Sequence, residues 1–115
     1  MNRKEKGNLG ESLAAKFLEG KNYKILERNW RYGKLGEIDI IAKDKETLVF
    51  VEVKTRSTTN FGQPIEAIDE RKYLQIKNIA NAYIMQSDEK YKNCRIDAVS
   101  VLLNTNEIKH IKNIF

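Results

Sequence analysis

The chain has 115 residues, a length that suits one domain over residues 1–115 and limits the size of its core. Its hydrophobic content of 41% and charged content of 32% are typical of a soluble globular protein, not of a membrane-embedded or low-complexity one. The net charge of +5 permits a polyanionic partner but does not require one, because the basic residues are spread along the chain.

The cysteine content and the N-terminal residues further restrict the class of protein. Cys94 is the single cysteine, which excludes an intramolecular disulfide, and we expect it to be buried or half-buried ahead of an apolar strand. The first eight residues are polar and charged, and no apolar run approaches the roughly 18 residues of a membrane span. We therefore expect a cytoplasmic protein with no membrane partner.

Hydrophobic periodicity and turn residues predict two helices and five strands. In chain order these are a helix over residues 4–18, a strand over 23–31, a β-hairpin over 36–56 with its turn at 44–47, a helix over 64–85, a strand over 95–103 and a strand over 107–115. Gly20 is expected to cap the first helix, and Pro64 is expected to open the second. The long second helix allows a parallel return, so the predicted fold class is α/β, a small mixed β-sheet with flanking helices in the order α-β-β-β-α-β-β.

The predicted hairpin carries charge where charge is costly. If the turn is central, cross-strand partners have numbers that sum to 91, so Asp39 lies opposite Glu52 and Glu37 lies opposite Lys54. All four side chains then share one face, because side chains alternate along a strand. Opposed carboxylates about 5 Å apart repel each other and call for a proton or a cation between them. A divalent metal held by carboxylate oxygens is the expected cation.

The alternative is that these charges simply cover one solvated face of the hairpin. However, Ile41 and Phe50 share the charged face. The other face carries only apolar side chains, those of Ile38, Ile40, Ala42, Val49, Val51 and Val53. Both faces are therefore expected to be covered, which leaves the charges clustered at one end of a buried hairpin. Paired carboxylates beside a lysine in such a place are typical of a catalytic site.

Asp39, followed by Glu52-Val53-Lys54, resembles the Asp…Glu-x-Lys signature of the PD-(D/E)XK nuclease superfamily, also called restriction-endonuclease-like. A wider resemblance, from Gly7 to about Val101, is carried by GNLGESLAAKFLEGKNYKILERNWR, GEIDIIA, LVFVEVKTR and FGQPIEAID. These segments are similar to the small bacterial YraN family, which is itself similar to archaeal Holliday-junction resolvases. The resemblance implies a restriction-endonuclease-like fold, whose core has the predicted element order, and a homodimer acting on branched DNA.

These residues lead to a hypothesis of metal-dependent phosphodiester hydrolysis. Asp39 and Glu52 are expected to ligate Mg²⁺ or Mn²⁺, which would polarise the scissile phosphate and lower the pKa of a bound water. Lys54 is expected to orient that water and to stabilise the developing negative charge. Glu11, on the first helix, matches the helical glutamate that the resemblance to resolvases places near the metal; the alternative is a solvated helix glutamate.

Four further residues are assigned around this centre. Glu37 is expected to be a ligand or only the ion-pair partner of Lys54. Arg56 shares the face of Lys54 and suits a phosphate contact, with a plain surface charge as the alternative. Lys72 falls on the apolar side of the second helix, so it either extends to solvent or meets the carboxylates or a phosphate. Gln75 lies one turn further along and is expected to assist it.

Three functions stay open from the sequence. The first is a structure-selective DNA endonuclease, the second a non-catalytic nucleic-acid-binding module on the same fold, and the third a protein-interaction role in which the basic charge serves solubility. Trp30, Tyr32 and Phe61 could stack on bases, although packing is the expected role of Trp30, and the sole histidine, His110, is expected to be exposed or half-packed. Without a base-reading element, shape or backbone recognition is expected.

Overall fold

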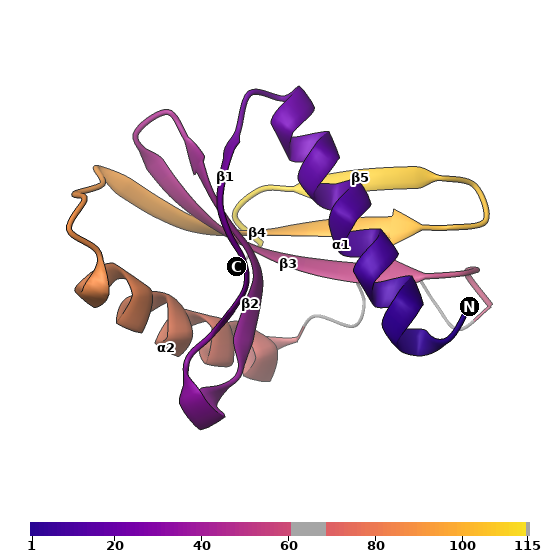
Figure 1. The fold of residues 1–115 in the computed structure, drawn as a ribbon, viewed down its shortest axis with the longest axis horizontal. Coiled ribbons are helices and arrows are strands. Elements are labelled where there is room, and N and C mark those ends of the chain that lie inside the picture. The colour runs from indigo at the N-terminus through magenta and orange to yellow at the C-terminus, as the bar shows by residue number, and fades with distance from the viewer. Residues whose placement is uncertain (61–68, 115) are drawn as a thin grey trace.

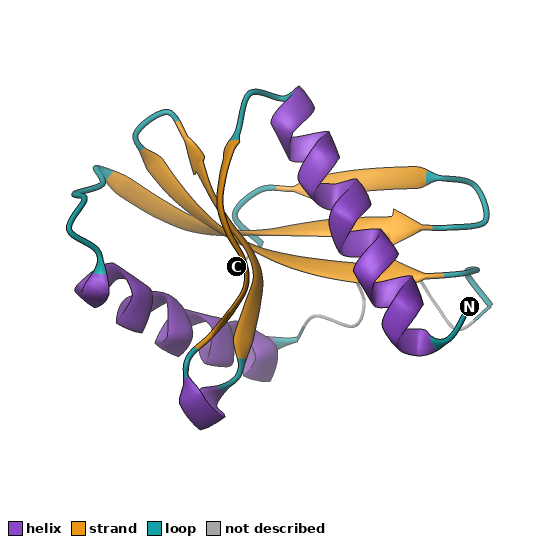
Figure 2. Ribbon diagram, viewed as in Figure 1, coloured by secondary structure: helices purple, strands orange, loops and turns teal. Residues whose placement is uncertain are grey.

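Two helices pack on opposite faces of a mixed β-sheet in the computed structural model, which describes residues 1–60 and 69–114 (Figures 1 and 2). The elements are α1 (Arg3–Gly20), β1 (Lys24–Arg31), the 3₁₀ turn η1 (Gly33–Leu35), β2 (Glu37–Asp44), β3 (Thr47–Arg56), α2 (Glu70–Gln86), β4 (Asn93–Leu102) and β5 (Glu107–Ile111). The predicted order α-β-β-β-α-β-β is confirmed. None of the described helices is both long enough and apolar enough to span a bilayer.

The five strands lie in the sheet in sequence order, β1-β2-β3-β4-β5. Strands β3 and β4 are parallel, and the other three neighbouring pairs are antiparallel. The parallel pair is the one joined through α2, as predicted from the length of that connection. The predicted small mixed sheet with flanking helices is therefore confirmed.

The register of the hairpin formed by β2 and β3 is confirmed near its turn and wrong beyond it. The residue numbers of paired residues sum to 91 from the pair Asp44–Thr47 to the pair Ile40–Val51, where the β2–β3 pairing ends. From there β2 curves away from β3, as Figure 1 shows. Asp39 is therefore not the ladder partner of Glu52. Instead, its Oδ2 accepts a hydrogen bond of 2.8 Å from the backbone N–H of Val53. The Asp39 side chain thus takes the place that a backbone carbonyl of β2 would have in a regular strand pair.

The same departure moves one predicted core residue to the other face. Ile38 packs in the cluster that contains Ile41 and Phe50, whereas strict alternation placed it with Ile40. Because β2 bends between these positions, the period of two is broken there. This bend separates β2 from β3 beyond Ile40 and Val51, next to Asp39.

Each face of the sheet has its own apolar cluster, which confirms that both faces are covered. The cluster under α1 consists of Ala14, Ala15, Leu18, Tyr23, Ile40, Ala42, Val49, Val51, Val53, Val99 and Val101. The cluster under α2 consists of Ile38, Ile41, Leu48, Phe50, Ile76, Ile79 and Ala80. The central strand β3 contributes to both, which is why its sequence is an almost continuous apolar run.

The first helix is longer than predicted and ends differently. Asn2 and Glu5 form a reciprocal capping box that starts α1 at Arg3. Gly20 is its last residue and not its left-handed cap, because the positive φ of 70° falls on Asn22. Asparagine tolerates this conformation better than most residues, so the turn does not need the glycine.

Two other boundaries are corrected. The second helix begins at Glu70 because the Asp69 side chain caps it in an extended conformation, with φ −116° and ψ −176°; the expectation at Pro64 lies outside the described residues. The last strand ends at Ile111 and not at residue 115. Asn113 adopts φ 55° and donates its backbone N–H to Asp97, which turns the chain away from the sheet edge.

Candidate functional site

The carboxylates of Asp39 and Glu52 lie close enough to interact at the point where β2 leaves β3. Burial, followed by the neighbouring Glu52 charge, raises the pKa of Asp39 to about 8. The Val53 N–H and the Lys72 ammonium oppose this shift without cancelling it. Asp39 is therefore protonated at neutral pH. This agrees with the expectation from the sequence that a proton or a cation lies between the two carboxylates.

Glu52 is the buried member of the pair, with 3% of its surface exposed. Its Oε1 lies 3.4 Å from the ammonium nitrogen of Lys54 and 3.4 Å from that of Lys72. Its Oε2 is buried and has no hydrogen-bond partner within residues 1–60 and 69–114. Of the alternatives predicted for Lys72, the structure favours the carboxylate contact. An unpartnered, buried carboxylate oxygen costs on the order of 1–3 kcal/mol or more, so its retention calls for an explanation.

The helix α1 brings a third carboxylate towards this pair through a close contact with β3. A Cβ added to Gly10 would lie 1.8 Å from Oγ1 of Thr55, so only glycine allows the two backbones to approach this closely. The next residue, Glu11, is half-buried and accepts a hydrogen bond of 2.8 Å from Nδ2 of Asn29. Its charge contributes to the raised pKa of Asp39, which places it within electrostatic reach of the pair.

A basic groove runs between the N-terminal half of α1 and the end of β3. It has a volume of about 520 Å³. Its lining consists of Arg3, Lys6, Gly7, Glu11, Val53, Lys54, Thr55, Arg56, Ser57 and Thr58. Four cations against one carboxylate make this a suitable channel for a phosphate backbone. Arg56 and Lys54, which were predicted to share a face, both lie in it.

The remaining two predicted residues lie on the other side of the site. Gln75 donates a hydrogen bond of 2.7 Å from Nε2 to the carbonyl oxygen of Leu35, which ties η1 to α2. Glu37 is half-buried at the start of β2, where its backbone pairs with Arg31. Within residues 1–60 and 69–114, Glu37 forms no ion pair with Lys54, whose carboxylate partner is Glu52. The bend in β2 explains this difference.

The donor set fits a hard divalent cation in part. Across the described residues, no three His, Cys, Asp or Glu side chains converge in a metal-binding geometry. However, Mg²⁺ is commonly held by one or two carboxylates together with substrate phosphate oxygens. Asp39 and Glu52 supply two carboxylates, and Oε2 of Glu52 has an unused lone-pair capacity. The pair therefore suits a cation that completes its coordination with substrate and water.

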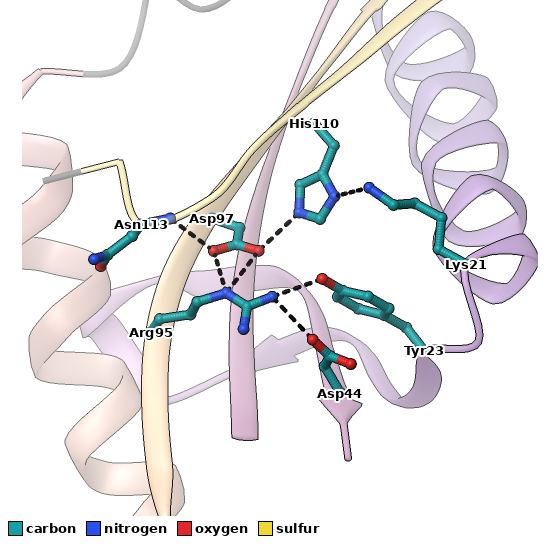
Figure 3. Close-up of polar contacts among 7 residues, drawn as sticks. All are labelled: Lys21, Tyr23, Asp44, Arg95, Asp97, His110 and Asn113. Carbon is teal, nitrogen blue, oxygen red and sulfur yellow. Dashed lines mark hydrogen bonds and ion pairs between the residues drawn. The ribbon is translucent and has the colours of Figure 1, made fainter. Parts of the chain in front are cut away.

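A second polar cluster, which sequence reasoning missed, lies on the α1 face of the sheet (Figure 3). Asp97 is fully buried there, yet both of its oxygens are partnered. Oδ1 accepts from Nε of Arg95 at 3.0 Å and from the N–H of Asn113 at 2.9 Å, and Oδ2 accepts from Nε2 of His110 at 2.7 Å. Although burial opposes it, these hydrogen bonds hold the pKa of Asp97 below its usual value.

The side chain of His110 is thus buried, with 2% of it exposed, and the expectation of an exposed or half-packed ring is wrong. The ammonium of Lys21 lies 2.9 Å from its Nδ1; because an ammonium only donates, Nδ1 accepts and Nε2 donates to Asp97. The available signal was Asp97 itself, a carboxylate inside an apolar strand. Cys94 is also corrected, because its thiol is exposed.

The comparisons with known proteins agree on one family. The family described as "Uncharacterised protein family UPF0102" matches residues 10–101. A UPF0102 protein of Caldanaerobacter subterraneus subsp. tengcongensis is 46% identical over all of this chain and 98% of its own length. UPF0102 proteins of Clostridioides difficile and Caldicellulosiruptor saccharolyticus are 44% and 47% identical, each over the full length of both chains. The expected YraN-type membership is confirmed: this chain belongs to the UPF0102 family.

Proposed function

We propose that this protein is a metal-dependent DNA endonuclease with a PD-(D/E)XK, restriction-endonuclease-like core. One observation carries the proposal. Glu52 is buried, and among the described residues one of its oxygens has no hydrogen-bond partner; it lies beside a second carboxylate, Asp39, and next to the ammonium groups of Lys54 and Lys72. A fold would gain stability by removing this repulsion, so its presence points to a ligand that needs it. The confirmed element order and the Asp…Glu-x-Lys pattern support the same assignment.

The residues divide the work of phosphodiester hydrolysis among them. A bound Mg²⁺ or Mn²⁺ would supply Lewis-acid activation of the phosphate and of a water molecule. Asp39 and Glu52 would hold that cation through oxygen, and Glu11 adds negative charge within electrostatic reach of the pair. Lys54 and Lys72 stabilise the negative charge that develops as the water oxygen bonds to phosphorus and the bond to the leaving sugar oxygen breaks. The water gives up its proton to solvent, and the leaving oxygen takes one up.

The groove beside the site favours nucleic acid as the partner, and DNA as its expected kind. Arg3, Lys6, Lys54 and Arg56 line it with positive charge, which suits contacts to the phosphate backbone, contacts that carry no base sequence information. The proposed substrate is therefore recognised by shape, which suits branched DNA of the Holliday-junction type. Two copies of the chain, as a homodimer, would match the two-fold symmetry of such a junction.

A cleavage screen tests this proposal. Linear, flapped, four-way and single-stranded DNA are incubated with the protein in Mg²⁺ or Mn²⁺. We expect metal-dependent cleavage of a branched form, lost in Asp39→Asn and Glu52→Gln, and reduced about 10²- to 10³-fold in Lys54→Ala. Glu46→Gln is the matched control, because it removes an exposed carboxylate at the far end of the same hairpin. Wild-type protein that cleaves none of these substrates contradicts the proposal.

A second candidate is a nucleic-acid-binding module without catalysis. It is favoured by the position of Lys54 and Lys72, which together neutralise Oε1 of Glu52 without any metal. Such a module would bind DNA equally well in EDTA and in Mg²⁺, would lose affinity steeply with salt, and would keep its binding in Glu52→Gln. Metal-independent binding without cleavage would select this function over the first.

A further inference from the structure

An aromatic stack stands at the end of the β1–β2 hairpin, next to the carboxylate pair. The ring centroids of Trp30 and Tyr32 lie 5.9 Å apart, and the rings are nearly parallel, with an interplanar angle of 15°. The ring of Tyr83 makes a T-shaped contact with that of Trp30, with 5.1 Å between the centroids. Trp30 is half-buried against the α2-side core, whereas Tyr32 remains 40% exposed. The stack therefore has a buried support and an outer ring that solvent can reach.

Strand pairing places the stack close to Asp39 in the proposed site. Trp30 pairs with Ile38, the neighbour of Asp39, and the N–H of Tyr32 donates to the carbonyl of Gly36 at 2.9 Å. Gly36 is three residues from Asp39, which is about 10 Å along an extended strand. At the 3.4 Å rise per nucleotide of a DNA strand, this corresponds to roughly three nucleotides.

The structure holds this hairpin end in place, which reduces the entropy lost when a ligand binds. The carbonyl of Leu35 accepts the Gln75 side chain from α2. Gly36 adopts φ 118°, and a Cβ there would lie 2.5 Å from Nε2 of Gln75, so the close contact requires glycine. Arg31 donates from its guanidinium to the carbonyl of Gly33, which braces the turn.

The charge around the stack favours a polyanion over an apolar protein partner. Residues 28–34, RNWRYGK, contain three cations and no carboxylate; Arg31 and Lys34 are exposed, whereas Arg28 donates from Nη2 to the Ser12 hydroxyl on α1. The nearest acidic residues in sequence are Glu27 and Glu37, one on each side of this segment. An exposed aromatic face set among cations is the combination used to bind single-stranded nucleic acid, where rings stack on bases and cations meet phosphates.

We propose that Tyr32, supported from behind by Trp30, stacks on an unpaired base of the bound strand beside the Asp39–Glu52 site. The substrate class is then DNA that presents unpaired nucleotides next to the scissile bond, such as a flap or the crossover of a junction. The position of the base relative to the scissile bond rests on the proposed nuclease function. The stacking itself does not.

Fluorescence anisotropy in EDTA at low salt tests the stacking without any cleavage. The probes are a labelled oligothymidylate and a labelled duplex of equal length. We expect Tyr32→Leu to weaken single-strand binding by about 5- to 150-fold while it changes duplex binding less than twofold. Tyr32→Phe keeps the aromatic face and is expected to bind as the wild type does. Tyr91→Leu is the matched control, because Tyr91 contacts Lys43 at the opposite end of β2.

The possible outcomes separate this inference from the proposed function. Single-strand binding that is absent in the wild type, or unchanged in Tyr32→Leu, contradicts the inference even if cleavage is observed. Tyr32-dependent single-strand binding by a protein that never cleaves DNA supports the inference and overturns the nuclease proposal. Tyr32-dependent self-association without a preference for single strands would identify a protein-docking surface and contradict the inference.

Discussion

Two partly or fully buried aspartates lie on the same sheet in opposite electrostatic states. Asp97 is surrounded by donors from Arg95, His110 and Asn113, and its pKa is lowered. Asp39 accepts the N–H of Val53 but lies beside the Glu52 carboxylate, and its pKa is raised to about 8. The first environment stabilises the charged form, whereas the second resists it.

The contrast separates a carboxylate whose two oxygens are both hydrogen-bonded from a carboxylate pair that we propose to hold a ligand. Asp97 joins β4, β5 and, through His110 and Lys21, the end of α1, as Figure 3 shows. Nothing is left for a ligand to supply there. In the part of the chain that the structure describes, Glu52 keeps a buried oxygen without a hydrogen-bond partner beside Asp39, so a cation would relieve both the repulsion and the missing contact. Burial alone therefore does not distinguish the two sites; the partners of each carboxylate do.

The largest effect is expected at Asp97. In Asp97→Ala, the buried His110 and the guanidinium of Arg95 lose their common acceptor, so we expect a loss of about 3–5 kcal/mol in the free energy of unfolding. Urea denaturation measures this loss. Asp97→Asn, which keeps one acceptor oxygen, is the control and should lose less. A change below about 1 kcal/mol in Asp97→Ala would show that this cluster does not hold the fold together.

The next largest effect is expected where α1 meets β3. Gly10→Ala places a Cβ against Thr55, so we expect a loss of about 1–3 kcal/mol and a displacement of Glu11 from the site. Gly7→Ala is the matched control on the same helix, because nothing lies within 4 Å of its added Cβ. It should gain up to about 1 kcal/mol from helix propensity. Equal stability of the two variants would disprove the close contact.

An effect with a characteristic pH dependence is expected at Asp39. Its folded pKa exceeds its unfolded pKa, so the native state binds the extra proton and stability falls as pH rises from about 4 to about 8. Asp39→Asn removes this slope and should be more stable than the wild type at pH 8. The lowered pKa of Asp97 acts in the opposite sense, because its contribution is lost in acid. Parallel pH profiles for wild type and Asp39→Asn would refute the shift.

The smallest effect is expected at an exposed ion pair. Lys92 lies 3.2 Å from Glu46, and both side chains are largely exposed. Solvent screening leaves such pairs worth about 0–1 kcal/mol, so Glu46→Gln should shift the denaturation midpoint very little. If Glu46→Gln lowered the free energy of unfolding as much as Asp97→Ala does, an exposed ion pair would contribute as much to folding as a buried, hydrogen-bonded carboxylate. That result would contradict the comparison.

The sequence was sufficient for the element order, the mixed sheet and the hairpin register near the turn, because apolar alternation and turn residues are local signals. It placed Asp39, Glu52 and Lys54 together, although through the wrong contact. The bend in β2 could not be anticipated, since it depends on Asp39 replacing a strand acceptor for Val53. The Asp97–His110 cluster was missed for a related reason: its members come from β4, β5 and the end of α1, and no spacing in the sequence links them.

Calorimetric titration of Mn²⁺ into the metal-free protein at about pH 6 and about pH 8.5 tests the central claim most directly. Because a ligating Asp39 must give up its proton, we expect affinity to rise by about tenfold per pH unit below a pKa near 8, with proton release. Asp39→Asn and Glu52→Gln should each remove the binding, while Asp97→Asn should leave it intact. Mn²⁺ binding that is independent of pH and of both substitutions, or no binding by the wild type, would contradict the account.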